Sequence, residues 1–260
     1  MVGIGPGHPD HLSKRAHDVL QSADVIAGYT TYIDLIRPLI RDKQIVSTGM
    51  TKEVDRVQAA IDIAREGKSC ALVSSGDPGI YAMAGLVFEM CQARGIPISA
   101  PDAAKTTPNG ESRLCVEVVP GIPALCAGAS LLGAPLTHDF AAISLSDLLT
   151  PWDIIEKRLE AAARADFVIV LYNPKSKRRA TLLEKAQEII MKHRDGKTPV
   201  GIVVSAMREK QDVSIVALED LHTADVNMQT AVFIGSTAST RYLDYMITPR
   251  GYSGKYAIGE

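Results

Sequence analysis

The chain has 260 residues; 46% of them are hydrophobic, 22% are charged, and the formal net charge is −2. This composition is that of an ordinary globular protein and gives no electrostatic reason to expect a nucleic-acid or membrane partner. We therefore expect a small-molecule partner. The length permits either one large domain or two modest ones.

The four cysteines form no Cys-x-x-Cys pair, and three of them lie in apolar runs, where a reduced cysteine behaves as a small hydrophobe. We expect free thiols rather than disulfides or metal ligands. No signal peptide opens the chain, and no apolar run approaches the length of about 20 residues that crosses a bilayer. The sequence therefore predicts a cytoplasmic protein without a metal site.

Short β-branched runs alternate with longer amphipathic stretches along the chain, which predicts an α/β fold with sheets covered on both faces. The first glycine turn follows Met1 and Val2 directly, so there is almost no room for the strand expected before it. Strands are predicted at 24–27, 44–46, 71–74, 116–119, 141–145, 167–171, 200–204 and 231–234. Helices are predicted at 10–21, 51–66, 80–94, 122–132, 151–165 and 181–193.

Residues 99–113 show no periodicity and are rich in Pro, Ala, Thr, Asn and Gly, which is typical of an exposed, mobile loop. After the strand that ends at Val119, the turn Pro120-Gly121 makes the best hinge, because α/β alternation is complete on both sides. We place the domain boundary there, with one α/β domain at 1–119 and a second at 120–260.

Three glycine-rich turns each join a strand to a helix, and each has a plain structural alternative. Gly3-Ile4-Gly5-Pro6-Gly7 suits close approach of backbone to a ligand, but its spacing departs from the dinucleotide fingerprint. Ser74–Tyr81 lies where a strand ends and α/β sheets bind ligands, although Asp77 or Ser75 could simply cap the next helix. Pro120–Leu125 fits a ligand contact and a bare turn equally well. The fragments Gly67-Lys68-Ser69 and Gly196-Lys197-Thr198 lack the upstream glycine of a phosphate loop and are expected to be turns.

In this order, the three turns resemble the S-adenosylmethionine site of the tetrapyrrole (precorrin) methyltransferases of cobalamin synthesis. The resemblance covers nearly the whole chain, with two departures, the short first strand and the long 99–113 connection. Four further segments are similar to the precorrin-3B C17-methyltransferase branch of that family: Gly28–Tyr32, Ser74–Ala84, Pro135–Asp147 and Leu171–Ser176.

The resemblance implies two α/β domains with parallel or mixed sheets flanked by helices, an interdomain trough and a homodimer. It implies methyl transfer from S-adenosylmethionine to C17 of a precorrin, coupled to ring contraction from precorrin-3B to precorrin-4, without a metal. Its motifs assign the cofactor contacts to Pro6, Gly76, Asp77, Ile80, Pro123, Ala124, Leu171, Tyr172, Met207 and Ser236.

Two further groups of residues suit the rest of this chemistry. A precorrin carries many carboxylate arms, so the cations after the Leu171-Tyr172 strand end are candidate substrate contacts, with a solvated helix start as the alternative. These cations are Lys175, Lys177, Arg178 and Arg179. Ring contraction calls for acid–base help, for which the nearest groups are His138, Asp139 and Asp147; a His-Asp pair that merely orients a loop is the alternative.

Three rival functions remain open from the sequence. The first is methylation of a cobalt-loaded substrate, cobalt-factor III, by the same chemistry. The second is a catalytically silent module that binds a tetrapyrrole. The third is a nucleotide-binding α/β protein that uses the first glycine turn for phosphate.

Overall fold

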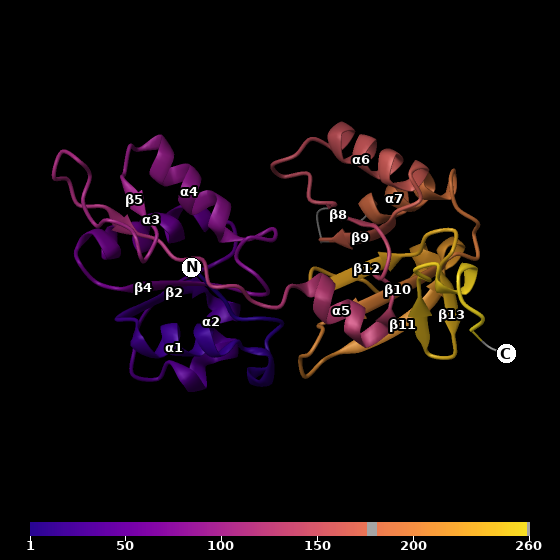
Figure 1. Cartoon of the computed structure of the whole chain (residues 1–260), viewed down its shortest axis with the longest axis horizontal. Coiled ribbons are helices and arrows are strands. Elements are labelled where there is room, and N and C mark those ends of the chain that lie inside the picture. Colours follow the sequence, from indigo (N-terminus) through magenta and orange to yellow (C-terminus); the bar gives the residue numbers. More distant parts are fainter. Residues whose placement is uncertain (176–180, 259–260) are drawn as a thin grey trace. The chain divides into compact units, whose positions relative to one another are not determined.

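The computed structural model describes residues 1–175 and 181–258, and its contacts divide the chain into two compact units, Met1–Pro123 and Ala124–Glu260. The predicted boundary after residue 119 falls slightly earlier, because residues 120–123 make their contacts with the first unit. Each unit is built around one main sheet with helices on both faces, as the alternation in the sequence predicts (Figure 1).

The first unit contains a parallel sheet in the order β1-β4-β2-β3. Side chains on β2 and β4 point alternately to two apolar clusters: Ile26, Ala71 and Val73 face one, and Ala27 and Leu72 face the other. Helices α1 and α2 cover the first face, and α3 and α4 cover the second. The strands are β1 (Val2–Gly3), β2 (Val25–Tyr29), β3 (Gln44–Thr48) and β4 (Cys70–Ser74), and the helices are α1 (Lys14–Ser22), α2 (Thr30–Ile36), α3 (Glu53–Arg65) and α4 (Met83–Ala93).

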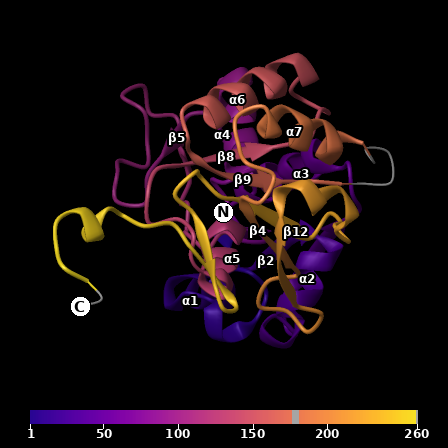
Figure 2. The same cartoon turned by 90° about the vertical axis from the view of Figure 1, so that its right-hand side faces the viewer.

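The second unit contains a mixed sheet in the order β11-β10-β12-β9-β8. β8, β9 and β10 run in one direction, while β12, between β9 and β10, and β11 at the edge run in the other. Helices α6 and α7 cover one face, and α5 covers the other (Figures 1 and 2). The strands are β8 (Phe140–Ser144), β9 (Val168–Tyr172), β10 (Pro199–Val204), β11 (Asp212–Ala217) and β12 (Thr230–Ile234), and the helices are α5 (Ala124–Leu132), α6 (Trp152–Arg164) and α7 (Leu182–Met191).

Two glycines allow α5 to lie close to this sheet. A Cβ atom on Gly128 would lie 2.6 Å from the Phe233 ring, and a Cβ on Gly201 would lie 2.4 Å from Leu132. Phe233 and Leu132 are both fully buried. The large side chains therefore fill the space that the missing side chains leave, which is the dense packing expected of a protein interior.

The structure differs from the predicted elements in a few places. Residues 116–119 form no regular strand; Val119 makes a single bridge to Val2, because β1 is only two residues long and offers little edge to pair with. α2 and the edge strand β11 were not predicted. Short pieces complete the described chain: strands β5 (Ile98–Ser99), β6 (Leu114–Cys115), β7 (Gly133–Ala134), β13 (Thr240–Tyr242) and β14 (Tyr245–Ile247), and 3-10 turns at Pro9–His11, Arg37–Leu39, Leu218–Thr223 and Tyr252–Gly254.

Residues 99–113 run between β5 and β6, which pair with each other in parallel. Most of these residues are exposed, and a bridge between Thr106 and Ser112 is the ordered feature within them. Within the described residues, no helix is both long enough and apolar enough to cross a membrane.

Candidate functional site

Three glycine-rich turns meet at one edge of the first sheet. β1 lies beside β4 and also bridges to Val119, so the turns that follow these three segments start side by side. The Gly5 N–H donates to the Gly76 carbonyl at 3.1 Å, and the Gly76 N–H donates to the Gly5 carbonyl at 2.7 Å. The turns therefore form one backbone cluster at the carboxyl ends of parallel strands, where open α/β sheets bind ligands.

The packing of this cluster requires residues without a side chain. A Cβ atom on Gly121 would lie 2.2 Å from the Gly76 carbonyl oxygen and 2.9 Å from the Gly3 carbonyl oxygen. A Cβ on Gly3 would lie 2.7 Å from the Gly121 nitrogen. Gly5 and Gly76 also have φ angles of 66° and 70°, in the left-handed region that favours glycine. Each turn thus needs its glycine in order to contact the other two.

Asp77 holds two of the turns together. Its Oδ1 accepts a hydrogen bond from the Gly79 N–H at 2.7 Å, and its Oδ2 accepts one from the Gly121 N–H at 3.1 Å. It does not cap the next helix, because α4 begins at Met83 and its N-cap residue makes no side-chain hydrogen bond. The Asp77 carboxylate therefore links two of the turns inside the cluster, at the position where the motif places a cofactor contact.

The remaining predicted residues of the first unit also lie in these turns. Pro6 is buried, while Ile80 and Pro123 are half-buried. Ser74, at the end of β4, is 2% exposed, and its Oγ has no hydrogen-bond partner among the described residues. An unsatisfied buried polar group costs about 1–3 kcal/mol. Backbone groups that approach closely, one carboxylate and one spare hydroxyl fit a small zwitterionic ligand with several polar groups.

Sequence reasoning missed Arg56, a buried cation near the same sheet edge. It is 4% exposed, its Nε donates to Thr48 Oγ1 at 2.8 Å, and its Nη2 donates to the Gly49 carbonyl at 2.9 Å. Its guanidinium lies 5.8 Å from the centre of the Tyr29 ring, a cation–π distance. Thr48 and Tyr29 end β3 and β2, so this charge lies at their carboxyl ends. The sequence signal was an arginine beside Val57 on the apolar stripe of α3.

In the second unit, Ala124, Leu171 and Tyr172 come together. The Tyr172 hydroxyl accepts a hydrogen bond from the Leu125 N–H at 2.9 Å, at the start of α5. The Leu171 side chain is fully buried in the core, so only its backbone is available to a ligand. Met207 follows β10 at the same edge of the sheet, and its N–H donates to Gln211 Oε1 at 2.8 Å.

Ser236 lies at the opposite edge of the second sheet from Tyr172 and Met207. β12 runs antiparallel to β9, with Ile234 paired with Ile169, so the residues after β12 lie beside the start of β9. Ser236 is 6% exposed, and its hydroxyl lies 3.2 Å from the Ser239 hydroxyl. The structure therefore does not group Ser236 with the other predicted cofactor contacts.

The three predicted acid–base residues are also divided. His138 and Asp139 precede β8 and Asp147 follows it, so a strand that rises about 3.3 Å per residue separates them. His138 Nδ1 accepts a hydrogen bond from the Asp139 N–H at 2.8 Å, which is the local loop contact of the alternative interpretation. Asp147 alone lies at the carboxyl edge beside Tyr172, because β8 and β9 are parallel.

Of the predicted substrate contacts, the structure describes only Lys175, which is half-buried shortly after β9. Lys177, Arg178 and Arg179 lie outside the described residues. Within residues 1–175 and 181–258, no three His, Cys, Asp or Glu side chains lie close enough together to hold a metal ion.

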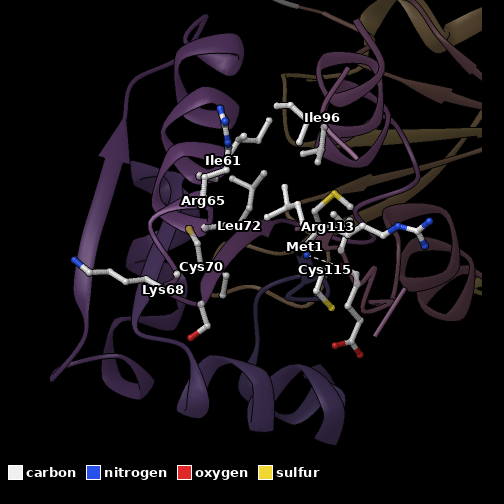
Figure 3. Close-up of a pocket in the computed structure, with 18 of the residues that line it drawn as sticks. Met1, Ile61, Arg65, Lys68, Cys70, Leu72, Ile96, Arg113 and Cys115 are labelled. Carbon is white, nitrogen blue, oxygen red and sulfur yellow. Dashed lines mark hydrogen bonds between the residues drawn. The ribbon is translucent and has the colours of Figure 1, made fainter. Parts of the chain in front are cut away.

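A cavity of about 1110 Å³ lies in the first unit (Figure 3), and no residue of the three glycine-rich turns lines it. Met1, Cys70, Leu72, Arg113 and Cys115 contribute to its walls. It opens where β1 pairs with β4 only at Val73 and Ser74, which leaves space beside the amino-terminal half of β4. Ligands of α/β sheets bind at the other ends of the strands. We therefore assign the candidate site to the glycine turns and not to this cavity.

Comparison with known proteins identifies the family of the chain. Residues 1–222 match the family described as Tetrapyrrole (Corrin/Porphyrin) Methylases. A Priestia megaterium protein named cobalt-factor III methyltransferase is 46% identical over 260 residues, which are 100% of this chain and 46% of that protein. A Salmonella typhimurium protein named probable cobalt-factor III C(17)-methyltransferase is 43% identical over 253 residues, which are 97% of this chain and 98% of that protein.

Among solved structures, the methyltransferase CobJ superimposes with a TM-score of 0.82 at 36% identity, over 95% of this chain and 98% of that one. The chain thus spans less than half of the Priestia protein but nearly all of the Salmonella protein and of CobJ. The arrangement described above, two units that each have one main sheet with helices on both faces, is therefore the fold of a tetrapyrrole methyltransferase.

Proposed function

Since the chain belongs to the tetrapyrrole (corrin/porphyrin) methylases, we propose that it transfers a methyl group from S-adenosylmethionine to C17 of a precorrin in cobalamin biosynthesis. The reaction forms a bond between C17 and the methyl carbon, while the electrons of the S–CH3 bond return to sulfur and leave S-adenosylhomocysteine. We propose that this step is coupled to ring contraction, from precorrin-3B to precorrin-4.

The observation that carries the proposal is the convergence of the three glycine turns around Asp77. The backbones at Gly5, Gly76 and Gly121 approach closely enough to fix the three turns as one surface for a zwitterionic donor, and Ser74 offers a spare buried hydroxyl. A displacement of this kind needs alignment of donor and acceptor more than it needs a nucleophile from the protein, and positioning can supply about 7–11 kcal/mol. Asp77 is proposed as the residue that fixes the geometry of the turns.

The proposed contacts in the second unit rest on its sheet edge. Tyr172 holds the start of α5 at this edge, and Met207 follows β10, which ends at the same edge. Asp147 is the one predicted acid–base group at the same edge, so it is our candidate for proton transfer during ring contraction. Lys175 is proposed to meet a carboxylate arm of the substrate. Leu171 is proposed to contact the cofactor through its backbone only, because its side chain is buried in the core.

A second candidate substrate is the cobalt-loaded analogue, cobalt-factor III. The names of the Priestia and Salmonella relatives favour it, and both are more than 40% identical to this chain. The chemistry at carbon is the same in both cases, since the methyl group leaves the same donor. The two candidates differ only in whether the macrocycle already carries a metal.

Mass spectrometry of the products made from each substrate with isotope-labelled S-adenosylmethionine tests the proposal. We expect a tetrapyrrole that carries one labelled methyl group. Label in the cobalt product alone would select the second candidate. A pigment that binds without acquiring label from either reaction would identify a silent binding module and refute the proposed activity. Preferential binding of adenine dinucleotides in a thermal-shift comparison would favour the nucleotide-binding alternative.

We further propose that the protein acts in the cytoplasm, as the sequence predicts, and that it is a homodimer, as the family resemblance implies. Sedimentation equilibrium should give twice the mass of the chain. A concentration-independent monomer mass would remove the dimer from the proposal without affecting the methyl transfer.

A further inference from the structure

Two consecutive leucines are exposed in the loop that follows β8. The Leu148 residue is 70% exposed and the Leu149 residue is 98% exposed. Asp147 precedes them, and Pro151 follows as the N-cap residue of α6. Exposed leucines gain about 1.5–3 kcal/mol each when an apolar surface covers them, so a pair of them at a ligand-binding edge is a candidate contact. Figure 1 shows this loop projecting beyond the start of α6.

The base of the loop is tied to the carboxyl end of the neighbouring strand. The Leu145 N–H donates to the Tyr172 carbonyl at 2.9 Å, and the Leu145 side chain is fully buried. Ser144 Oγ accepts hydrogen bonds from the Asn173 side-chain amide at 3.0 Å and from the Ser146 N–H at 3.2 Å. The leucines are therefore held at the edge of the sheet where β8, β9 and β10 end.

Strained backbone collects at this same edge. Asn173 has a φ angle of 53°, Ser205 of 50° and Met207 of 56°, which are left-handed values that non-glycine residues seldom adopt. Such conformations persist where the surrounding contacts enforce them, and they gather at ligand-binding sites. Here the Ser205 hydroxyl lies 2.8 Å from Gln229 Oε1, and Met207 is held by Gln211. The leucines thus lie at a sheet edge where the strained backbone is a second, independent indication of a binding site.

We propose that Leu148 and Leu149 form an apolar subsite that contacts the face of the tetrapyrrole macrocycle. The inference rests on the proposed function, which supplies a ligand with a broad apolar ring face and carboxylates confined to its rim. Leucine side chains complement the ring face, and they leave the rim to polar groups such as Lys175. The subsite therefore recognises the macrocycle and not S-adenosylmethionine.

The test replaces both leucines with serine and measures each ligand separately. Absorbance titration with cobalt-factor III or precorrin-3B gives the pigment Kd, and calorimetry gives the S-adenosylmethionine Kd. In the L148S/L149S variant we expect the pigment Kd to rise at least about tenfold, because apolar contact area is lost. We expect an unchanged S-adenosylmethionine Kd and an unchanged melting temperature, because Leu149 has almost no protein contact to lose.

Leu243 provides the matched control, since it is also 70% exposed and lies in the same unit, between β13 and β14. The L243S variant should bind pigment as the wild type does. An unchanged pigment Kd in L148S/L149S would overturn the subsite. If the variant changed only its oligomeric state, the leucines would instead be assigned to contacts between copies of the chain, and the subsite would also be overturned. Wild-type protein that binds pigment through these leucines but transfers no methyl group would keep the subsite and refute the proposed function. Methyl transfer by the wild type, together with normal pigment binding by L148S/L149S, would refute the subsite and keep the proposed function.

Discussion

Replacing Gly121 with alanine should break the contact between the three glycine turns. The new Cβ would lie 2.2 Å from the Gly76 carbonyl oxygen, 2.8 Å from the Gly3 carbonyl carbon and 2.9 Å from the Gly3 carbonyl oxygen. Favourable contacts of a carbon atom lie near 3.5 Å, so the shortest of these contacts is too close by about 1.3 Å. All three atoms belong to backbone and cannot rotate away as the end of a side chain can.

The expected cost follows from this overlap. Overpacking of an interior costs about 1–3 kcal/mol and more where backbone must move, so we expect G121A to lower the free energy of unfolding by about 3 kcal/mol. The φ angle of Gly121 is not in the left-handed region, so the effect is steric and not conformational. The displacement would also lengthen the hydrogen bond from the Gly121 N–H to Asp77. Affinity for S-adenosylmethionine should fall together with stability.

Urea unfolding and calorimetric titration with S-adenosylmethionine measure the two effects. G49A is the control, because a Cβ on Gly49 meets nothing within 4 Å and this glycine has no positive φ; its stability should be unchanged or raised by less than about 1 kcal/mol. G79A gives a milder variant of the site, since its Cβ would meet only Asp77 Oδ1 at 3.2 Å. Wild-type stability and wild-type affinity in G121A would refute the packing argument.

Three further predictions concern single groups. D77A removes the acceptor of the Gly79 and Gly121 N–H groups, so it should lower the free energy of unfolding by about 1–3 kcal/mol and weaken S-adenosylmethionine binding; a folded variant with unchanged affinity by calorimetry would exclude Asp77 from the site. Burial raises the pKa of the Cys70 thiol to about 11, so about a thousandth of it is thiolate at pH 8 and Ellman's reagent should label the exposed Cys115 and Cys126 first; peptide mapping that finds Cys70 labelled as fast as Cys115 would contradict this. Hydrogen bonds from Arg15, at 2.9 Å and 2.7 Å, hold the pKa of Glu117 below its usual range, so this pair stabilises the fold above the unfolded pKa of about 4.3 and loses that effect as pH falls through the lowered folded value. The melting temperature of E117Q should therefore lie slightly below that of the wild type at pH 7 and equal it in acid. A difference in melting temperature that grows on acidification would contradict this prediction.

Local sequence signals predicted most of the elements because those signals act over short distances. The apolar runs of β2, β4, β9, β10 and β12 mark strands that are buried on both faces, and the amphipathic stripes of α1, α6 and α7 mark the helices that cover them. The glycine turns were predicted in the same way, since in the sequence each follows a short apolar run and precedes a helical pattern. β11 was missed because it is an edge strand with half its surface toward solvent.

The candidate site required contacts that spacing along the chain does not report. Nothing local shows that Asp77 bonds to Gly121, far away in sequence, or that the Gly76 carbonyl occupies the space of a side chain there. The resemblance assigned Ser236 to the same site as Tyr172, and spacing along the chain does not show in which direction the strand before Ser236 runs. The antiparallel insertion of β12 between β9 and β10 reverses that placement, and only the pairing of the strands reveals it.

The most direct test of the account is a 13C NMR spectrum of the tetrapyrrole product made with 13C-methyl S-adenosylmethionine. The account predicts one enriched methyl resonance, coupled to C17, and its loss in D77A protein that still binds the pigment. An enriched methyl on another ring carbon, or an unlabelled tetrapyrrole recovered from wild-type protein saturated with both ligands, would contradict it.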